Sequence, residues 1–155
     1  MSIESRAGRW SRKGFSAIAF GLTLLLTVGA ARDATGFKVL VHGAQAGSAI
    51  RRAQLQDIFL KKVTQWGNGS PIEPVDQSMR SRARVSFSLN VLDLPMSAVQ
   101  AYWERQVVSS RERPPVVLGS DEEVIAFVAL TPGGIGYVST EASVGDAVKV
   151  LKVVD

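Results

Sequence analysis

The chain has 155 residues, of which 18 are basic and 14 acidic, and it contains no cysteine. This length fits one domain, and the lack of cysteine excludes disulfides, thiolate metal sites and cysteine-based catalysis. Four of the basic residues and one acidic residue precede position 32, so 14 basic and 13 acidic residues lie from position 32 onward. Because this later part is close to neutral, a nucleic-acid-binding protein is not expected.

Residues 1–31 have the pattern of a secretory signal peptide. A basic start is followed by an uncharged apolar run at 15–28 and then by small residues at 29–31. This order is typical of a cleavable signal, and the run is short for a spanning helix, which needs roughly 20 apolar residues. We therefore predict export to the periplasm through a signal peptide at 1–31, with an uncleaved N-terminal membrane anchor as the alternative.

The sequence from position 37 onward alternates between strand and helix patterns, which indicates an α/β domain. Runs rich in β-branched and aromatic residues predict strands, and apolar residues at helical spacing predict helices. In chain order we expect a strand at 37–41, a helix at 50–62, a strand at 72–75, a helix capped by Ser78 or Ser81 and continuing to 92, a helix starting at a Ser97–Gln100 capping box and running to 109, a strand at 116–118, a helix at 121–130, and strands at 135–138 and 148–154.

The most tightly specified unit lies at 119–139. Ser120 and Glu123 form a capping box, and the helix that follows is apolar on most sides, so we expect it to be buried. The turn at 131–134 contains proline and two glycines, which would let a ligand or a second backbone approach closely. Because the acidic first turn of this helix would repel an anion, we interpret the unit as core rather than as a binding site.

The segment after the strand at 72–75 carries the strongest chemical signal. Two serines and three arginines cluster where a helix is expected to begin: Ser78, Arg80, Ser81, Arg82 and Arg84. Cations at a helix start oppose the helix dipole, which favours negative charge there. Free backbone N–H groups, hydroxyls and arginines are together what an oxyanion needs. We therefore predict a ligand-binding site for an anion at these five residues.

A second interpretation of the same arginines stays open. They can be solvated, or they can pair with Asp76 and Glu73, which precede them in the chain. In that case the segment is a structural cluster of charges without a ligand.

The sequence contains no catalytic motif. His42 is the only histidine, and a lone histidine at a strand end is more often structural than catalytic. No G-x-S-x-G elbow, P-loop or dinucleotide-binding glycine motif occurs in a strand–turn–helix setting. We therefore expect that the protein is not an enzyme and that it uses neither a cofactor nor a metal. Trp66 is interpreted as an aromatic cover on the core, with ligand stacking as the alternative.

Several segments together resemble a known group of proteins. They are Leu55-Gln56-Asp57-Ile58-Phe59-Leu60, Val63-Thr64-Gln65-Trp66, Ile72-Glu73-Pro74-Val75-Asp76-Gln77, Ala101-Tyr102-Trp103, Gly119-Ser120-Asp121 and Thr131-Pro132-Gly133-Gly134-Ile135-Gly136-Tyr137-Val138. In this order they resemble small exported proteins related to the phosphate-binding proteins of ABC uptake systems. The segments at 57–60 and 132–137 are the most specific.

This resemblance implies a single lobe of the type II periplasmic binding protein (PBP) fold over residues 37–155, with a mixed β-sheet flanked by helices. It also implies a solute-binding protein for phosphate or a related oxyanion, with an ABC permease or another envelope protein as partner. By place, Ser81 and Arg84 match the serine-containing helix start of the family and the arginine that follows it.

The sequence departs from the family in two ways. Full-length phosphate binders have Ser-Gly-Thr at the helix start, where this chain has Ser81-Arg82-Ala83. They also close two lobes over the ligand, whereas this chain is long enough for about one. The alternative function is therefore a periplasmic protein-interaction module that has the same fold and binds no ligand.

Overall fold

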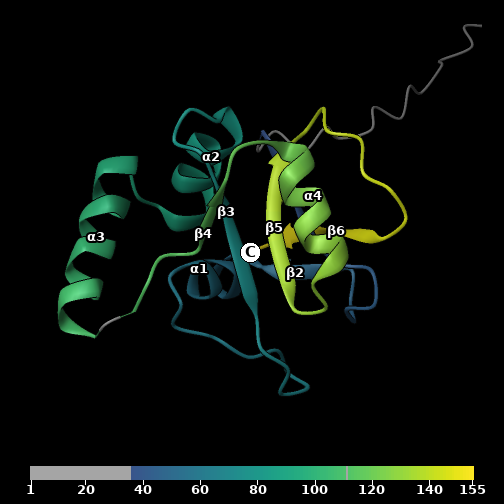
Figure 1. Cartoon of the computed structure of the whole chain (residues 1–155), viewed down its shortest axis with the longest axis horizontal. Coiled ribbons are helices and arrows are strands. Elements are labelled where there is room, and N and C mark those ends of the chain that lie inside the picture. Colours follow the sequence, from purple (N-terminus) through teal and green to yellow (C-terminus); the bar gives the residue numbers. More distant parts are fainter. Residues whose placement is uncertain (1–35, 111) are drawn as a thin grey trace, which may run out of the picture. The chain divides into compact units, whose positions relative to one another are not determined.

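The computed structural model describes residues 36–110 and 112–155 (Figure 1). The predicted signal peptide at 1–31 lies outside these residues. Within the described part of the chain, none of the helices is both long and apolar enough to span a bilayer.

Six strands form one mixed sheet in the order β2-β6-β1-β5-β3-β4. The central strand β1 pairs antiparallel with β5 and β6, whereas β3 runs parallel to both β4 and β5. The strands are β1 (Phe37–His42), β2 (Ala49–Arg51), β3 (Glu73–Gln77), β4 (Val116–Leu118), β5 (Gly134–Ser139) and β6 (Val148–Val154). The predicted strands are confirmed, and β2 is an addition to them.

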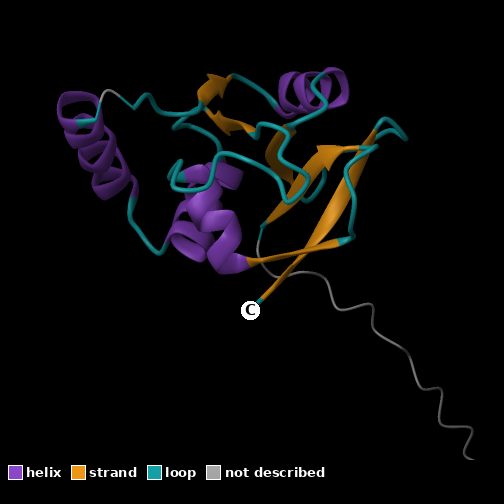
Figure 2. Cartoon of the chain, turned by 90° about the horizontal axis from the view of Figure 1, so that it is seen from below, coloured by secondary structure: helices purple, strands orange, loops and turns teal. Residues whose placement is uncertain are grey.

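Helices cover both faces of the sheet, as Figure 2 shows. Because successive strand residues point to opposite faces, Val39 and Val41 belong to one core and Leu40 to the other. The helices α1, α2, η1 and α3 pack on the first core, and α4 packs on the second. They are α1 (Arg52–Phe59), α2 (Arg82–Phe87), the π-helical turn η1 (Ser88–Leu92), α3 (Met96–Ser109) and α4 (Asp121–Leu130).

An aromatic cluster fills the first core directly beneath α2. The Phe87 ring stacks on the Tyr137 ring, with centroids 4.0 Å apart and 6° between the planes. Phe37 and Phe59 contact both rings in edge-on or tilted arrangements. Tyr137 is thereby fully buried, and its position fixes where its hydroxyl group lies.

The helix predicted at 50–62 is wrong at both ends. Residues Ala49–Arg51 form β2, which pairs parallel with β6, and Ile50 is buried between two exposed neighbours. This alternation of exposed and buried residues matches the two-residue period of a strand and not the 3.6-residue period of a helix. The helix α1 begins only at Arg52 and ends before Lys61, which adopts a left-handed φ of 54°.

The helix starts follow two of the three predicted caps. Ser81 accepts a hydrogen bond from the Arg84 N–H at 3.3 Å, and Ser120 accepts one from the Glu123 N–H at 3.2 Å. The capping box predicted at Ser97 is wrong, because α3 begins at Met96 behind Pro95. The Pro95 carbonyl accepts hydrogen bonds from the Ala98 and Val99 N–H groups. Pro95 is thus the residue at the N-cap, and no side chain caps this helix.

The expectation that the helix at 121–130 is buried holds for one face only. Val124 and Val128 are fully buried against the sheet, but Leu130 is 83% exposed at the end of α4. Ile125 and Phe127 are partly buried against the same core, so only part of the apolar surface of this helix is exposed.

The glycine turn before β5 brings two backbones together. The Gly133 carbonyl accepts hydrogen bonds from the Glu73 N–H at 2.9 Å and from the Trp66 indole N–H at 3.3 Å. A Cβ atom at Gly133 would collide with the carbonyl oxygen of Pro71. The close partner of this turn is therefore a second backbone, and the buried Trp66 is part of the core.

Replacing Gly133 by alanine tests this packing. Because the obstructing atom belongs to a backbone that is held by hydrogen bonds, we expect the Gly133→Ala variant to lose about 1–3 kcal/mol of unfolding free energy. Urea denaturation measures the loss. Gly67→Ala is the matched control, since a Cβ atom there has no neighbour within 4 Å. Equal midpoints for both variants would refute the close approach.

Candidate functional site

The carboxyl ends of three parallel strands meet at one edge of the sheet. The Ser78 N–H, just after β3, donates to the carbonyl of Leu118 at the end of β4 at 2.9 Å. The Gln77 side chain donates to the Tyr137 carbonyl of β5 at 2.8 Å. In open α/β sheets ligands bind at such carboxyl ends, so the loop at 78–81 occupies the expected position of a site.

Asp121, in the first turn of α4, links the carboxyl ends of β3 and β5. Its carboxylate accepts hydrogen bonds from the Gln77 side chain at 2.7 Å and from the Ser139 N–H and hydroxyl at 3.1 and 2.5 Å. In the sequence this residue is recognisable only as part of the acidic first turn of a helix. The structure shows that it also joins the ends of β3 and β5.

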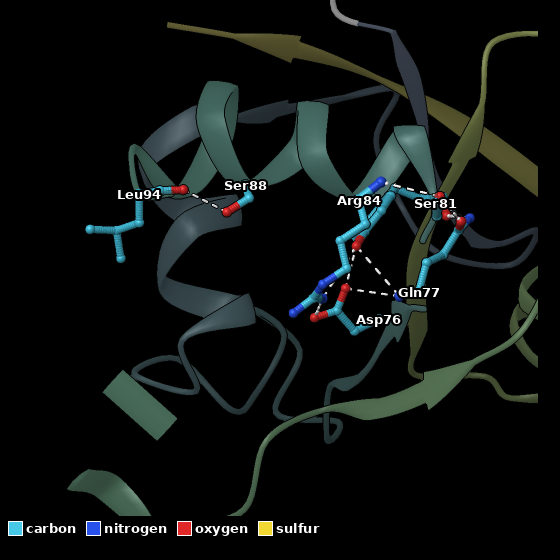
Figure 3. A network of polar contacts seen from close by, with 7 residues as sticks. Asp76, Gln77, Ser81, Arg84, Ser88 and Leu94 are labelled. Atoms are coloured by element: carbon cyan, nitrogen blue, oxygen red, sulfur yellow. Dashed lines mark hydrogen bonds and ion pairs between the residues drawn. The ribbon is translucent and has the colours of Figure 1, made fainter. Parts of the chain in front are cut away.

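A buried ion pair lies under the start of α2. An Arg84 Nη1 atom pairs with the Asp76 carboxylate and lies 3.5 Å from the Tyr137 hydroxyl, as Figure 3 shows for the Arg84 and Asp76 side chains. The Tyr137 hydroxyl donates to the other oxygen of Asp76, which also accepts from the Gln77 N–H at 2.8 Å. The side chains of Arg84 and Asp76 are only 12% and 8% exposed.

Burial changes the ionisation of this network. It lowers the pKa of the Arg84 guanidinium from its ordinary value, and the neighbouring Tyr137 partly opposes that shift. Burial also raises the pKa of Tyr137 to about 12, against the opposing effect of Arg84. Tyr137 therefore remains a neutral hydrogen-bond donor at physiological pH.

The structure separates the five residues predicted as ligands into two groups. Ser81 and Arg84 are engaged inside the lobe, since the Ser81 hydroxyl donates to the Gln77 side chain while capping α2. Ser78 is partly exposed, and Arg80 and Arg82 are exposed. Within residues 36–110 and 112–155, the side chains of Arg80 and Arg82 form no ion pair.

The second interpretation of the arginines is thus correct for Arg84, which pairs with Asp76. Sequence reasoning missed Tyr137 and Gln77 as members of the network. A signal for Gln77 was available, because it is a polar residue at the end of a strand that leads into a capped helix. No such signal exists for Tyr137, whose contribution depends on the pairing of β5 with β1 and β3.

Two other expectations concern residues away from this edge. The His42 imidazole accepts a hydrogen bond from the Ala44 N–H at 3.2 Å, as a structural histidine at a strand end would. Across the described ranges, no group of three or more His, Asp and Glu side chains is arranged to hold a metal ion.

Comparisons with known proteins address the fold. No protein-family model matches the sequence, and no curated protein matches it. Among solved structures, the lobe resembles an ABC-type phosphate transport receptor from Vibrio cholerae (TM-score 0.58, 21% identity) and PstS from Borrelia burgdorferi (TM-score 0.57, 18% identity). It also resembles a phosphate ABC transporter substrate-binding protein structure from Clostridium perfringens that holds bound phosphate (TM-score 0.54, 21% identity).

The extent of these matches defines what is shared. Each covers 76% of this chain, but only 46%, 47% and 44% of the respective solved chains. The chain therefore spans less than half the length of the structures that it matches. The resemblance noted in the sequence is confirmed at the level of the fold: the described residues form a single type II PBP-like lobe, with a mixed sheet flanked by helices.

Proposed function

We propose that the chain is an exported solute-binding protein that binds phosphate or a related oxyanion at the loop between β3 and α2. One observation carries the proposal: Ser78, Arg80 and Arg82 are not buried, and they lie where the parallel strands end. The fold likeness to phosphate receptors, one of them with bound phosphate, supports it. On this proposal an ABC permease or another envelope protein would be the partner.

The chemistry of the loop suits a weakly held anion. Arg80 and Arg82 would supply positive charge, the Ser78 hydroxyl would donate a hydrogen bond, and the first turn of α2 would add backbone N–H groups. Because the Arg80 and Arg82 side chains are exposed, their electrostatic attraction for the anion is screened by solvent and salt. We therefore expect binding in roughly the millimolar range rather than tighter.

Arg84 has a different role in this proposal. Its guanidinium is already paired with Asp76, so an anion that approached it would have to compete with a buried carboxylate. Arg84 and Ser81 would then position the loop and the start of α2, while Arg80 and Arg82 contact the anion. This assignment narrows the predicted set of five ligands to the exposed part of the segment.

The second candidate function is a periplasmic interaction module that binds no small anion. The internal use of Ser81 and Arg84 favours it, because two of the five predicted ligands are then unavailable. The two candidates differ in whether phosphate binds to the purified chain.

Isothermal titration with inorganic phosphate distinguishes them. We expect heat with a dissociation constant of about 1 mM, and at least about tenfold weaker binding for an Arg80→Ala/Arg82→Ala double variant, because two cations that face the anion are removed. Arg51→Ala is the control, an exposed arginine on β2 at the opposite edge of the sheet. Absence of heat at millimolar phosphate would reject the binding proposal and favour the interaction module.

The difference between the buried, paired Arg84 and the exposed Arg80 and Arg82 gives a separate prediction for stability. Arg84→Ala leaves the Asp76 carboxylate buried without its partner, so we expect a loss of about 3–5 kcal/mol in unfolding free energy. Arg80→Ala and Arg82→Ala should each change it by less than about 0.5 kcal/mol, because both side chains are at the surface. Chemical denaturation monitored by circular dichroism provides the values. Similar losses of unfolding free energy at all three positions would contradict the assignment of Arg84 to a structural role and of Arg80 and Arg82 to the surface.

A further inference from the structure

A groove of about 560 Å³ lies between α3 and the β3–β4 end of the sheet. Figures 1 and 2 both show α3 set apart from α1 and α2. Its walls include Val99, Trp103 and Val107 from α3 and Val117 from β4. The volume falls within the range of small-molecule sites, which are mostly apolar and have a few polar groups.

The groove exists because the helices cover this face of the sheet unevenly. Val117 is in register with Asp76, so its side chain lies on the face that α1 and α2 cover near the centre of the sheet. At the edge strand β4 no such cover is present among the described residues, and Val117 is 57% exposed. On the opposite wall Val107 is 48% exposed. Apolar side chains that face each other across open space indicate a binding surface.

The polar groups of the groove limit what can occupy it. Arg84 lines the groove, and its Nε atom is buried without a hydrogen-bond partner. A buried donor of this kind is costly until an acceptor reaches it. The charge of Arg84 is already balanced by Asp76, and among the described residues of the lining the other charged side chain is that of Glu104. The groove therefore has in its lining a guanidinium whose charge is balanced and whose side chain is 12% exposed, which favours a neutral acceptor over an anion.

We propose that this groove binds a small, uncharged and largely apolar molecule that carries a carbonyl-type acceptor. Its apolar body would lie between Val107 and Val117, and its acceptor would be directed toward Arg84. The site differs in chemistry from the oxyanion site on the loop between β3 and α2, and it does not depend on phosphate binding. The same lobe would then accept two kinds of ligand at adjoining surfaces, since Met79 of the loop between β3 and α2 also lines the groove.

Nile red, a neutral and apolar dye with a carbonyl group, is a suitable probe. Titrated into the purified chain, it should show saturable fluorescence enhancement. Val107→Asp and Val117→Asp should each weaken binding at least about tenfold, because each places a charge on an apolar wall. Leu130→Asp is the matched control, since Leu130 is an exposed apolar residue on α4, which packs on the other face. Circular dichroism of each variant verifies that the fold is kept.

Three outcomes would overturn the proposal. The first is equal dye binding by Val117→Asp and Leu130→Asp. The second is tighter binding of the anionic dye anilinonaphthalene sulfonate than of Nile red, which would show that the groove selects negative charge. The third is a dimer in sedimentation velocity that Val117→Asp dissociates, which would show that a second copy of the chain fills the groove.

Discussion

The buried ion pair between Asp76 and Arg84 is the interaction on which the rest of the site depends. The pair joins β3 to α2, and the Tyr137 hydroxyl of β5 donates a hydrogen bond to Asp76. Taking both charges out of water is tolerated because the two charges pair with each other and because Asp76 accepts further hydrogen bonds. The pair therefore fixes the direction of α2 and, with it, the position of the loop that carries the exposed arginines.

The same pair separates the charges of the lobe. Arg84 faces inward and is neutralised, whereas Arg80 and Arg82 keep their charge at the surface. One side of the segment is thus cationic and open to anions, and the other side borders an apolar groove with no net positive charge. Three arginines within five residues consequently serve two surfaces of opposite chemical character.

Much of the fold could be predicted from local sequence. Runs rich in β-branched and aromatic residues located β1, β4, β5 and β6, and the serines at 81 and 120 marked two helix starts. The short strand β2 could not be predicted, because Ile50 becomes a strand residue only through its pairing with β6. The exposure of Leu130 was missed for a similar reason, since the sequence does not show how much surface a neighbouring layer covers.

The candidate site was predictable as a segment but not in its geometry. The arginine-rich helix start was visible in the sequence, and so was the possibility that Asp76 would pair with one of its cations. Which arginine would turn inward depends on Tyr137, more than fifty residues later, and on the stacking of Phe87 against it. Long-range placement of this kind leaves no local pattern.

Backbone and arginine side-chain NMR during a phosphate titration tests the central claim most directly. The account predicts that the amide shifts concentrate at residues 78–83 and that the side-chain signals of Arg80 and Arg82 move, while the Arg84 side-chain signal keeps its position. Movement of the Arg84 signal with loss of its pairing to Asp76, or no response anywhere in the loop, would contradict the account.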